Sequence, residues 1–419
     1  MGRYARDKSL QNPKPVERIE LEEKNVGIRI AIVAVLILIA VSSFGYGISQ
    51  WLSVDSGWTE IEADSAADTN VSNEFVLMYE LGTREDMTVV AENKGIRALY
   101  TEVMVDAYQI FHNNIEIEGV NNIYYLNSHP NEEIQVDEML YQAFEILNAN
   151  DNRNIFLAPI YEQYNNLFDC EVDAQTMEFD PYLNEPLADE FKEIAEFVKD
   201  PTKVRIELLE NNTIKLYVSE EYLQYANENG ITSFIDFAWM KNAFIVDYLA
   251  ECLLENGYKA ATISSYDGFS RNIDDRGTQF SQNIYDYNEG KVIQAAKVSY
   301  ETTQSTVAMQ SFPINALDAY RYYVYENGET RSNYIDTYDG LCKSVVNSVY
   351  ASSAKYSCTE IMFWIQNLYI SDYFDMGLWN VLQSFDVQVL LVKDNTIFYN
   401  DDSLNISNVY SSYTTSPMN

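Results

Sequence analysis

Apolar and polar positions along this chain recur with two different periods, and each period predicts a type of element. Apolar residues every three to four positions predict helices, which we expect at residues 94–111, 136–147, 185–198, 244–255 and 357–367. Alternation with a period of two predicts strands, which we expect at residues 75–79, 87–90, 203–209, 213–218, 295–300, 307–309, 322–325, 344–350, 387–393 and 396–399. Asn211-Asn212 and Asp394-Asn395 are typical turns of two hairpins. Helices and strands therefore alternate in mixed order.

One apolar run, residues 30–52, contains no charged residue. It is long enough for a transmembrane helix, which needs roughly 20 apolar residues. Seven Lys and Arg precede Ile30, and none occurs between Ile30 and Thr83. By the positive-inside rule, residues 1–29 are expected in the cytoplasm and the rest of the chain outside the cell membrane. The alternative is a cleaved signal peptide with Ala40-Val41-Ser42 as its cleavage site.

The remaining chain divides by composition into three segments. Residues 53–73 are rich in Asp, Ser, Thr and Ala, which predicts a flexible extracytoplasmic stalk. Residues 74–402 carry the predicted helices and strands and form the folded domain. The polar tail, residues 403–419, is expected to be disordered or to associate with a sheet edge.

Charge and rare residues exclude several functions. The net charge of −37 excludes a general nucleic-acid partner, because phosphate binding needs clustered Lys and Arg. His112 and His129 are the only histidines, so a catalytic triad or a histidine-rich metal site would depend on them. The four cysteines form no CxxC pair and leave three disulfide pairings open; they are Cys170, Cys252, Cys342 and Cys358.

The segment Ile235 to Tyr258, IDFAWMKNAFIVDYLAECLLENGY, resembles the central signature of the FAD:protein FMN transferases. Ile235-Asp236-Phe237 matches the end of the family's strand, and Phe244-Ile245-Val246-Asp247 matches the start of its helix. Further motifs follow in the family's order at Glu80 to Thr83, Leu126-Asn127 and residues 156–168. The resemblance implies an α+β domain built from two related antiparallel sheet halves, with the flavin site between them.

The family's activity, as the resemblance implies it, is cleavage of FAD and attachment of FMN to a threonine of an acceptor protein. Its Mg²⁺ is held by an Asp and a Thr at a helix start, and Cys358 and Met362 stand at these positions here. Sulfur is a poor ligand for magnesium. The expected site therefore has no metal ligand and no catalytic residue, and Cys358 and Met362 are expected to face the core.

The polar groups of the flavin cleft also differ from the family's pattern. Its Gly-Gly pair is replaced by Ala238-Trp239, and its lysine by Asn242, with Lys241 one position earlier. Asp236, Lys241, Asn242 and Asp336 are the residues left from a flavin cleft. We expect Trp239 to pack inward beside Tyr266 or Phe269 and to fill part of the cleft, so that FAD binds weakly or not at all.

The sequence is thus identified as a degenerate member of this family. It favours a membrane-anchored, non-catalytic binding or assembly subunit with an extracytoplasmic protein partner and no cofactor. The alternative is a divergent, active transferase that uses FAD and Mg²⁺ to attach FMN to a threonine of an exported redox protein.

Overall fold

The chain separates into two parts, residues 1–54 and residues 55–419. The computed structural model describes residues 31–37, 39, 42–43, 55–65 and 70–418. The few described residues of the first part are helical. Most of the predicted transmembrane segment, residues 30–52, lies outside the described residues. Among those that are described, no helix is long and apolar enough to cross a membrane.

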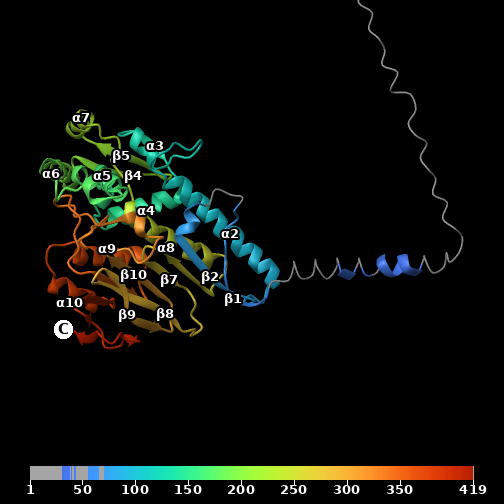
Figure 1. The fold of residues 1–419 in the computed structure, drawn as a ribbon. Coiled ribbons are helices and arrows are strands. Elements are labelled where there is room, and N and C mark those ends of the chain that lie inside the picture. Colours follow the sequence, from blue (N-terminus) through green and yellow to red (C-terminus); the bar gives the residue numbers. More distant parts are fainter. Residues whose placement is uncertain (1–30, 38, 40–41, 44–54, 66–69, 419) are drawn as a thin grey trace, which may run out of the picture. The chain divides into compact units, whose positions relative to one another are not determined.

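The second part is built on a nine-stranded sheet (Figure 1). Its strands, in spatial order, are β1 (Gly57–Glu60), β2 (Phe75–Leu81), β6 (Ala261–Ser265), β7 (Phe269–Asn272), β10 (Gln304–Gln310), β13 (Ser348–Ser353), β14 (Gln388–Lys393), β15 (Thr396–Tyr399) and β17 (Thr414–Pro417). All neighbours are antiparallel except β15 and β17. The two expected sheet halves are joined where β7 pairs with β10, so they form one continuous sheet.

Three smaller sheets and nine α-helices complete the described residues of the second part. The small sheets are β16 (Asn405–Ser407) with β9 (Lys291–Tyr300) and β8 (Phe280–Asn288), β3 (Glu133–Gln135) with β5 (Thr213–Val218) and β4 (Val204–Leu209), and β11 (Tyr322–Val324) with β12 (Thr330–Ser332). The helices are α2 (Val89–Ile110), α3 (Ile123–Ser128), α4 (Glu138–Ala149), α5 (Ala158–Phe168), α6 (Glu185–Lys199), α7 (Glu220–Asn229), α8 (Lys241–Glu255), α9 (Cys358–Tyr369) and α10 (Met376–Ser384).

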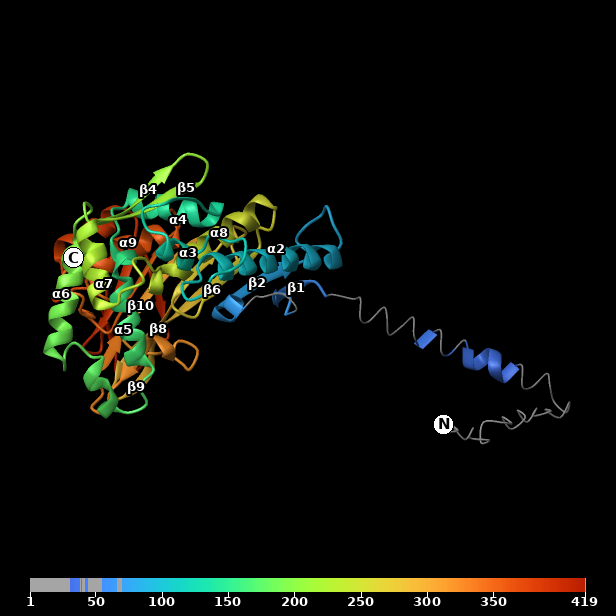
Figure 2. The same ribbon diagram turned by 90° about the horizontal axis from the view of Figure 1, so that it is seen from above.

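The central strands of the large sheet are covered on both faces. Helices α8 and α9 contact strands β6, β7, β10 and β13, and the β8–β9 sheet covers strands of the same sheet elsewhere (Figure 2). The register places Ala308, Tyr350 and Leu390 in one row across three strands, and this row packs against Ile284 and Ala296. Because strands covered on both sides lose their polar–apolar alternation, every residue of β10 is buried.

Most elements that the apolar periods predict are present, including both hairpins. The exceptions are explained by a helix N-cap and by pairing at the edges of sheets. Residues 87–90 were expected as a strand, but the Thr88 side chain accepts a hydrogen bond from the Ala91 N–H and starts α2 at Val89. Residues 57–60 of the expected stalk form edge strand β1. The polar tail is edge-associated through β16 and β17.

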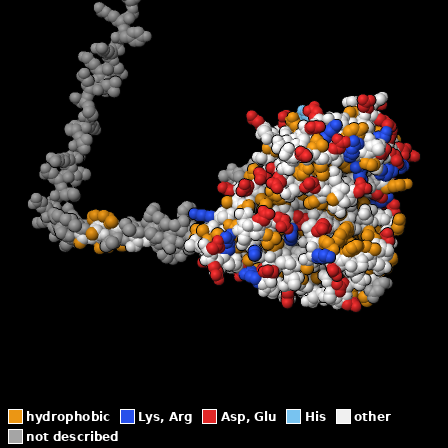
Figure 3. Space-filling model, turned by 180° about the vertical axis from the view of Figure 1, so that it is seen from behind, with side chains coloured by type: hydrophobic (Ala, Val, Ile, Leu, Met, Phe, Trp, Pro, Cys, Tyr) orange, Lys and Arg blue, Asp and Glu red, His pale blue; other side chains and the backbone are white. Residues whose placement is uncertain are grey.

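Two further features of the structure are its acidic surface and its unpaired cysteines. Acidic side chains are scattered over the face of the second part in Figure 3. All four cysteines are free thiols, and Cys342 and Cys358 are buried.

The buried carboxylate of Glu92 connects the first strand–turn to α2. It accepts hydrogen bonds from the Tyr79 hydroxyl at 2.6 Å, the Gly82 N–H at 2.7 Å and the Thr83 hydroxyl at 3.2 Å. Burial, together with the hydrogen bond to Glu92, raises the pKa of Tyr79, so this phenol stays protonated as a donor.

We predict that Glu92→Ala lowers the free energy of unfolding by about 2–4 kcal/mol, because the buried Tyr79 hydroxyl and two further donors lose one acceptor. Urea denaturation measures the loss. Glu102→Ala, on an exposed position of the same helix, is the matched control and should change stability by less than about 0.5 kcal/mol. Equal effects of the two substitutions would contradict a structural role for the Glu92 carboxylate.

Candidate functional site

The chain enters α8 through a short 3₁₀ turn, Ala238–Met240, in place of the family's glycine pair. Ala238 has φ of +44°, in the left-handed region that favours glycine. The backbone here thus has a glycine-like conformation although the residue is alanine. The turn is held by the Asp236 carboxylate, which accepts a hydrogen bond from the Ala238 N–H at 2.8 Å.

Trp239 packs inward, as the sequence predicts, and is 2% exposed. Its ring meets the edge of Tyr334 at a centroid distance of 5.2 Å. Tyr334 is thus its ring neighbour, and contact of Trp239 with Tyr266 or Phe269 stays a prediction. Tyr266 lines a surface hollow together with Tyr100 and Leu317. The Trp239 indole N–H has no hydrogen-bond partner among the described residues.

Lys241 and Asn242 are brought together by one carboxylate, that of Glu74. The Lys241 ammonium contacts Glu74 Oε1 at 2.9 Å, and the Asn242 amide donates to Oε2 at 2.8 Å. Glu74 ends the turn that precedes β2, and its backbone carbonyl also accepts from the Tyr266 N–H. Lys241, the cation among the predicted cleft residues, is therefore already paired with a carboxylate.

A second ion pair is fully inside the protein. Arg321 Nη1 lies 2.9 Å from Asp267 Oδ2, and their side chains are 5% and 7% exposed. Asp267 Oδ1 and Asn242 Oδ1 have no hydrogen-bond partner among the described residues. Burial raises the pKa of Asp267, and the Arg321 guanidinium opposes that rise.

Asp336 belongs to a different cluster from the other three predicted residues. Its carboxylate contacts Lys343 Nζ at 2.8 Å, and Asp339 and Asp372 contact the same nitrogen at 2.8 Å each. Burial lowers the pKa of Lys343, but the three carboxylates outweigh it and raise that pKa overall. The Asp336 carboxylate is thus bonded to Lys343 and to the Tyr338 N–H, and not to Lys241 or Asn242, whose shared partner is Glu74.

The start of α9 is where the family's metal ligands would stand. Cys358 and Met362 are completely buried, which confirms that they face the core. The Cys358 thiol donates to the Ser270 carbonyl at 3.3 Å and lies 3.7 Å from the Thr306 carbonyl. Burial holds the pKa of this thiol well above its usual range, with the nearby Asp247 carboxylate adding to the rise. A protonated, buried sulfur is unsuited to Mg²⁺, so these residues do not fit the metal.

Asp247, from α8, occupies the polar space beside that helix start. Its oxygens accept hydrogen bonds from the N–H groups of Cys358 and Thr359 at 2.9 and 2.8 Å, and from the Thr359 hydroxyl at 2.8 Å. Arg271 lies 3.5 Å from the same carboxylate. In the described chain, no three His, Cys, Asp or Glu side chains are grouped so that they could hold a metal ion.

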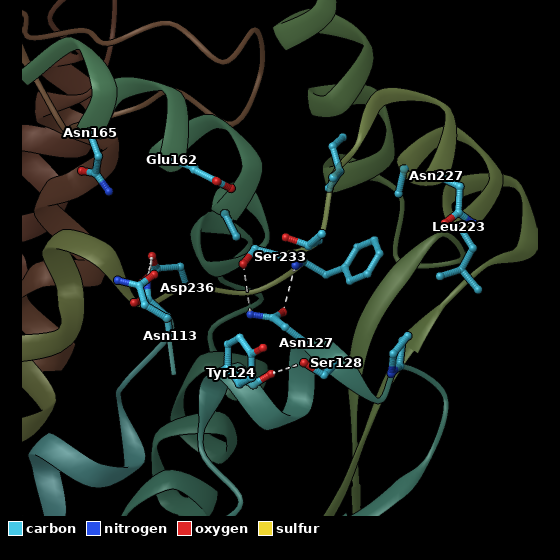
Figure 4. Close-up of a pocket in the computed structure, with 17 residues that line it drawn as sticks. Asn113, Tyr124, Asn127, Ser128, Glu162, Asn165, Leu223, Asn227, Ser233 and Asp236 are labelled. Atoms are coloured by element: carbon cyan, nitrogen blue, oxygen red, sulfur yellow. Dashed lines mark hydrogen bonds between the residues drawn. The ribbon is translucent and has the colours of Figure 1, made fainter. Parts of the chain in front are cut away.

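A polar hollow that Asp236 helps to line is drawn in Figure 4, and we call it the amide cavity. Its volume is about 560 Å³, and Asp236 is one of the 17 residues that line it. The other lining residues come from α3, α5, α7, the loop before α3, the turn after α3 and the loop after α7: Asn113, Asn114, Tyr124, Asn127, Ser128, Pro130, Ala158, Glu162, Asn165, Leu223, Ala226, Asn227, Ile231, Thr232, Ser233 and Phe234. None of the lining residues, all of them described, is Lys, Arg or His.

Sequence reasoning missed Glu74, Arg321 and most of the amide cavity. Glu74 was seen only as the first residue of the domain, and Arg321 carried no motif. The signal available for the cavity was Leu126-Asn127, because Asn127 now proves to hold the loop before Asp236 through the Phe234 and Ile235 N–H groups.

Comparison with solved structures shows which fold this is. The ApbE protein from Thermotoga maritima superposes with a TM-score of 0.52 at 14% identity, covering 81% of this chain and 94% of that protein. The flavin transferase ApbE from Vibrio cholerae gives a TM-score of 0.53 at 12% identity, covering 86% of this chain and 100% of that one. No family model matches the sequence, and comparison with curated proteins finds no match. The chain therefore has an ApbE-like fold.

We predict that Ala238→Gly stabilises the protein by about 0.5–1 kcal/mol, because relief of the left-handed strain exceeds the entropy that glycine adds to the unfolded chain. Ala243→Gly, in the regular part of α8, is the control and should destabilise by about 1 kcal/mol. Urea denaturation of both variants gives the comparison. A loss of stability in Ala238→Gly would show that this backbone strain is absent.

Proposed function

We propose that this chain is a membrane-anchored protein whose ApbE-like domain is non-catalytic and serves as an extracytoplasmic binding or assembly subunit. Residues 30–52 would form the anchor, with residues 1–29 in the cytoplasm and the domain outside. Similarity to the ApbE structures supports the fold. The side chains of this chain are the reason that we propose no catalytic activity.

The observation that carries the proposal is the start of α9. Cys358 and Met362 replace hard oxygen ligands, and the Cys358 sulfur is turned to backbone carbonyls of the sheet. Asp247, the nearest carboxylate, has its two oxygens bonded to the helix N–H groups. Cleavage of a pyrophosphate needs its developing charge neutralised, commonly by a metal held on oxygen ligands. These residues offer a metal no such set of ligands.

The cations near the cleft support the same conclusion. Lys241 is paired with Glu74, and Arg321 with Asp267. An FAD phosphate would have to replace a carboxylate that is already in contact, and the displaced carboxylate would repel it. Trp239, buried against Tyr334, occupies volume where the family has a glycine. Neither FAD nor Mg²⁺ fits the residues present.

A divergent FAD:protein FMN transferase is the second candidate, and the names of the structural neighbours favour it. It would transfer FMN to a threonine of an exported redox protein and would need FAD and Mg²⁺. The two candidates differ in one measurable property, the release of FMN from FAD.

We predict that the purified chain shows no Mg²⁺-dependent release of FMN from FAD and no saturable FAD binding at micromolar concentration. Flavin and tryptophan fluorescence report binding, and chromatography of the nucleotides reports cleavage. Cys358→Asp combined with Met362→Thr should not restore activity, because the Glu74 and Asp267 carboxylates still occupy the cations. FMN release by the unmodified chain would overturn the non-catalytic proposal, and FAD binding that is lost in Trp239→Gly would make Trp239 a flavin platform.

We also predict that protease added to intact cells degrades the chain beyond Leu52, because the basic residues before Ile30 favour a cytoplasmic N-terminus. An epitope at the N-terminus should stay protected and one at the C-terminus should be lost. Where the cell has an outer membrane, that membrane is first made permeable. Protection of both epitopes in cells whose inner membrane is intact would contradict the proposed orientation.

A further inference from the structure

We propose that the amide cavity binds a neutral oligosaccharide, which makes a polyhydroxylated ligand the object of the binding role proposed above. The inference rests on that proposed function and goes further by naming a ligand class and a place. Asn113 and Asn114 line both this cavity and a smaller hollow of about 260 Å³, so the two hollows are neighbours on the surface. Two neighbouring hollows suit a chain of linked rings better than a single small molecule.

The charge of the cavity excludes anionic ligands. Asp236 and Glu162 line it, and none of its described lining residues is basic. The adjoining hollow is lined by His112 and by Lys241, whose ammonium is already paired with the Glu74 carboxylate. A phosphate or a uronic acid would therefore enter beside two carboxylates without a counter-charge, on a chain with a net charge of −37. A neutral ligand carries no such electrostatic penalty.

The walls present hydrogen-bonding groups that the protein does not itself use. The side chains of Asn165 on α5 and Asn227 on α7 are exposed and form no side-chain hydrogen bond with other described residues, and Figure 4 places them on opposite walls. Each amide offers donors and an acceptor a fixed distance apart. Adjacent hydroxyls of a sugar ring present the complementary pair, because each hydroxyl both donates and accepts.

The floor of the cavity is held rigid before any ligand arrives. Asn127 accepts from the N–H groups of Phe234 and Ile235 and donates to the Ile235 carbonyl at 2.9 Å. Asn113 donates to Asp236 at 2.6 Å. Fixed polar groups lose little entropy on binding, which favours weak ligands such as sugars. The Tyr124 ring, 36% exposed, adds an apolar face on which the C–H side of a sugar ring can lie.

A peptide fits these walls less well. Extended peptides commonly bind by adding a strand to an unpaired sheet edge, or by placing side chains in apolar pockets. All residues lining the amide cavity come from helices and loops, so they offer no strand edge. Figure 4 shows polar groups from several elements turned towards the cavity.

The test is calorimetric titration of the full-length chain in a detergent without a sugar head group. The probes are the tetrasaccharides of glucose, mannose and N-acetylglucosamine, with tetragalacturonate as the acidic comparison and a Gly-Ser-Asn decapeptide as the peptide comparison. We expect saturable binding of at least one neutral tetrasaccharide and none of tetragalacturonate. The double variant Asn165→Ala with Asn227→Ala should weaken that binding about tenfold or more. Asn166→Ala, exposed on α5 and outside the cavity lining, should leave it unchanged.

Three results would overturn the inference: no neutral tetrasaccharide binds, binding is equally strong in the double variant, or the decapeptide alone binds and is lost in that variant. Circular dichroism of the double variant separates lost binding from lost folding. FMN release from FAD by the same preparation would contradict the non-catalytic proposal. It would not change the saccharide result, which these titrations decide. Failure of the proposed function and failure of the saccharide inference are therefore distinguishable.

Discussion

The Asp247 carboxylate joins three elements, and the chemistry available at the start of α9 depends on it. The first N–H groups of a helix have no partner within the helix, and a negative charge is favourable there. Asp247 on α8 accepts two of them, from Cys358 and Thr359, while Arg271 on β7 lies 3.5 Å away. Burial raises the pKa of Asp247, but Arg271 and the helix donors favour its charged form. With the helix fixed in this way, the Cys358 sulfur faces the sheet carbonyls, and no oxygen of Asp247 is left without a partner.

Pairing of charges also explains the polar contacts near Trp239. A buried cation needs a partner, because removing an isolated charge from water costs far more than a fold can supply. Arg321 has Asp267, Lys241 has Glu74, and Lys343 has three carboxylates. In a binding site for phosphates, such cations would be held by neutral groups and left for the ligand. Here each of the three cations is paired with a carboxylate of the same chain, so none of them is left for a phosphate.

The apolar periods predicted most helices and strands because those periods are set by which face of each element is buried. They predicted the hairpins at Asn211-Asn212 and Asp394-Asn395, whose four turn residues all have positive φ. They failed where a single polar contact decides the outcome, as at Thr88, which starts a helix in a run of β-branched residues. The site was harder to predict, because its partners are distant in sequence. Glu74 and Asn242 are 168 residues apart, and only the fold shows that they share a hydrogen bond.

This chain shares its fold with ApbE structures at only 12–14% sequence identity. Packing of the fold therefore fixes far fewer residue identities than a catalytic site would. Sheet and helices need apolar side chains of suitable volume, and many sequences supply them. A metal or phosphate site needs particular atoms in particular places, and a single change from oxygen to sulfur removes it. The amide cavity is built by helix ends and loops, the parts of a fold in which binding groups change most freely. An ApbE-like fold can therefore keep its shape without such a site. In the binding role that we propose, the ligand would be held by Asn165, Asn227 and Asp236, which no element of the nine-stranded sheet supplies.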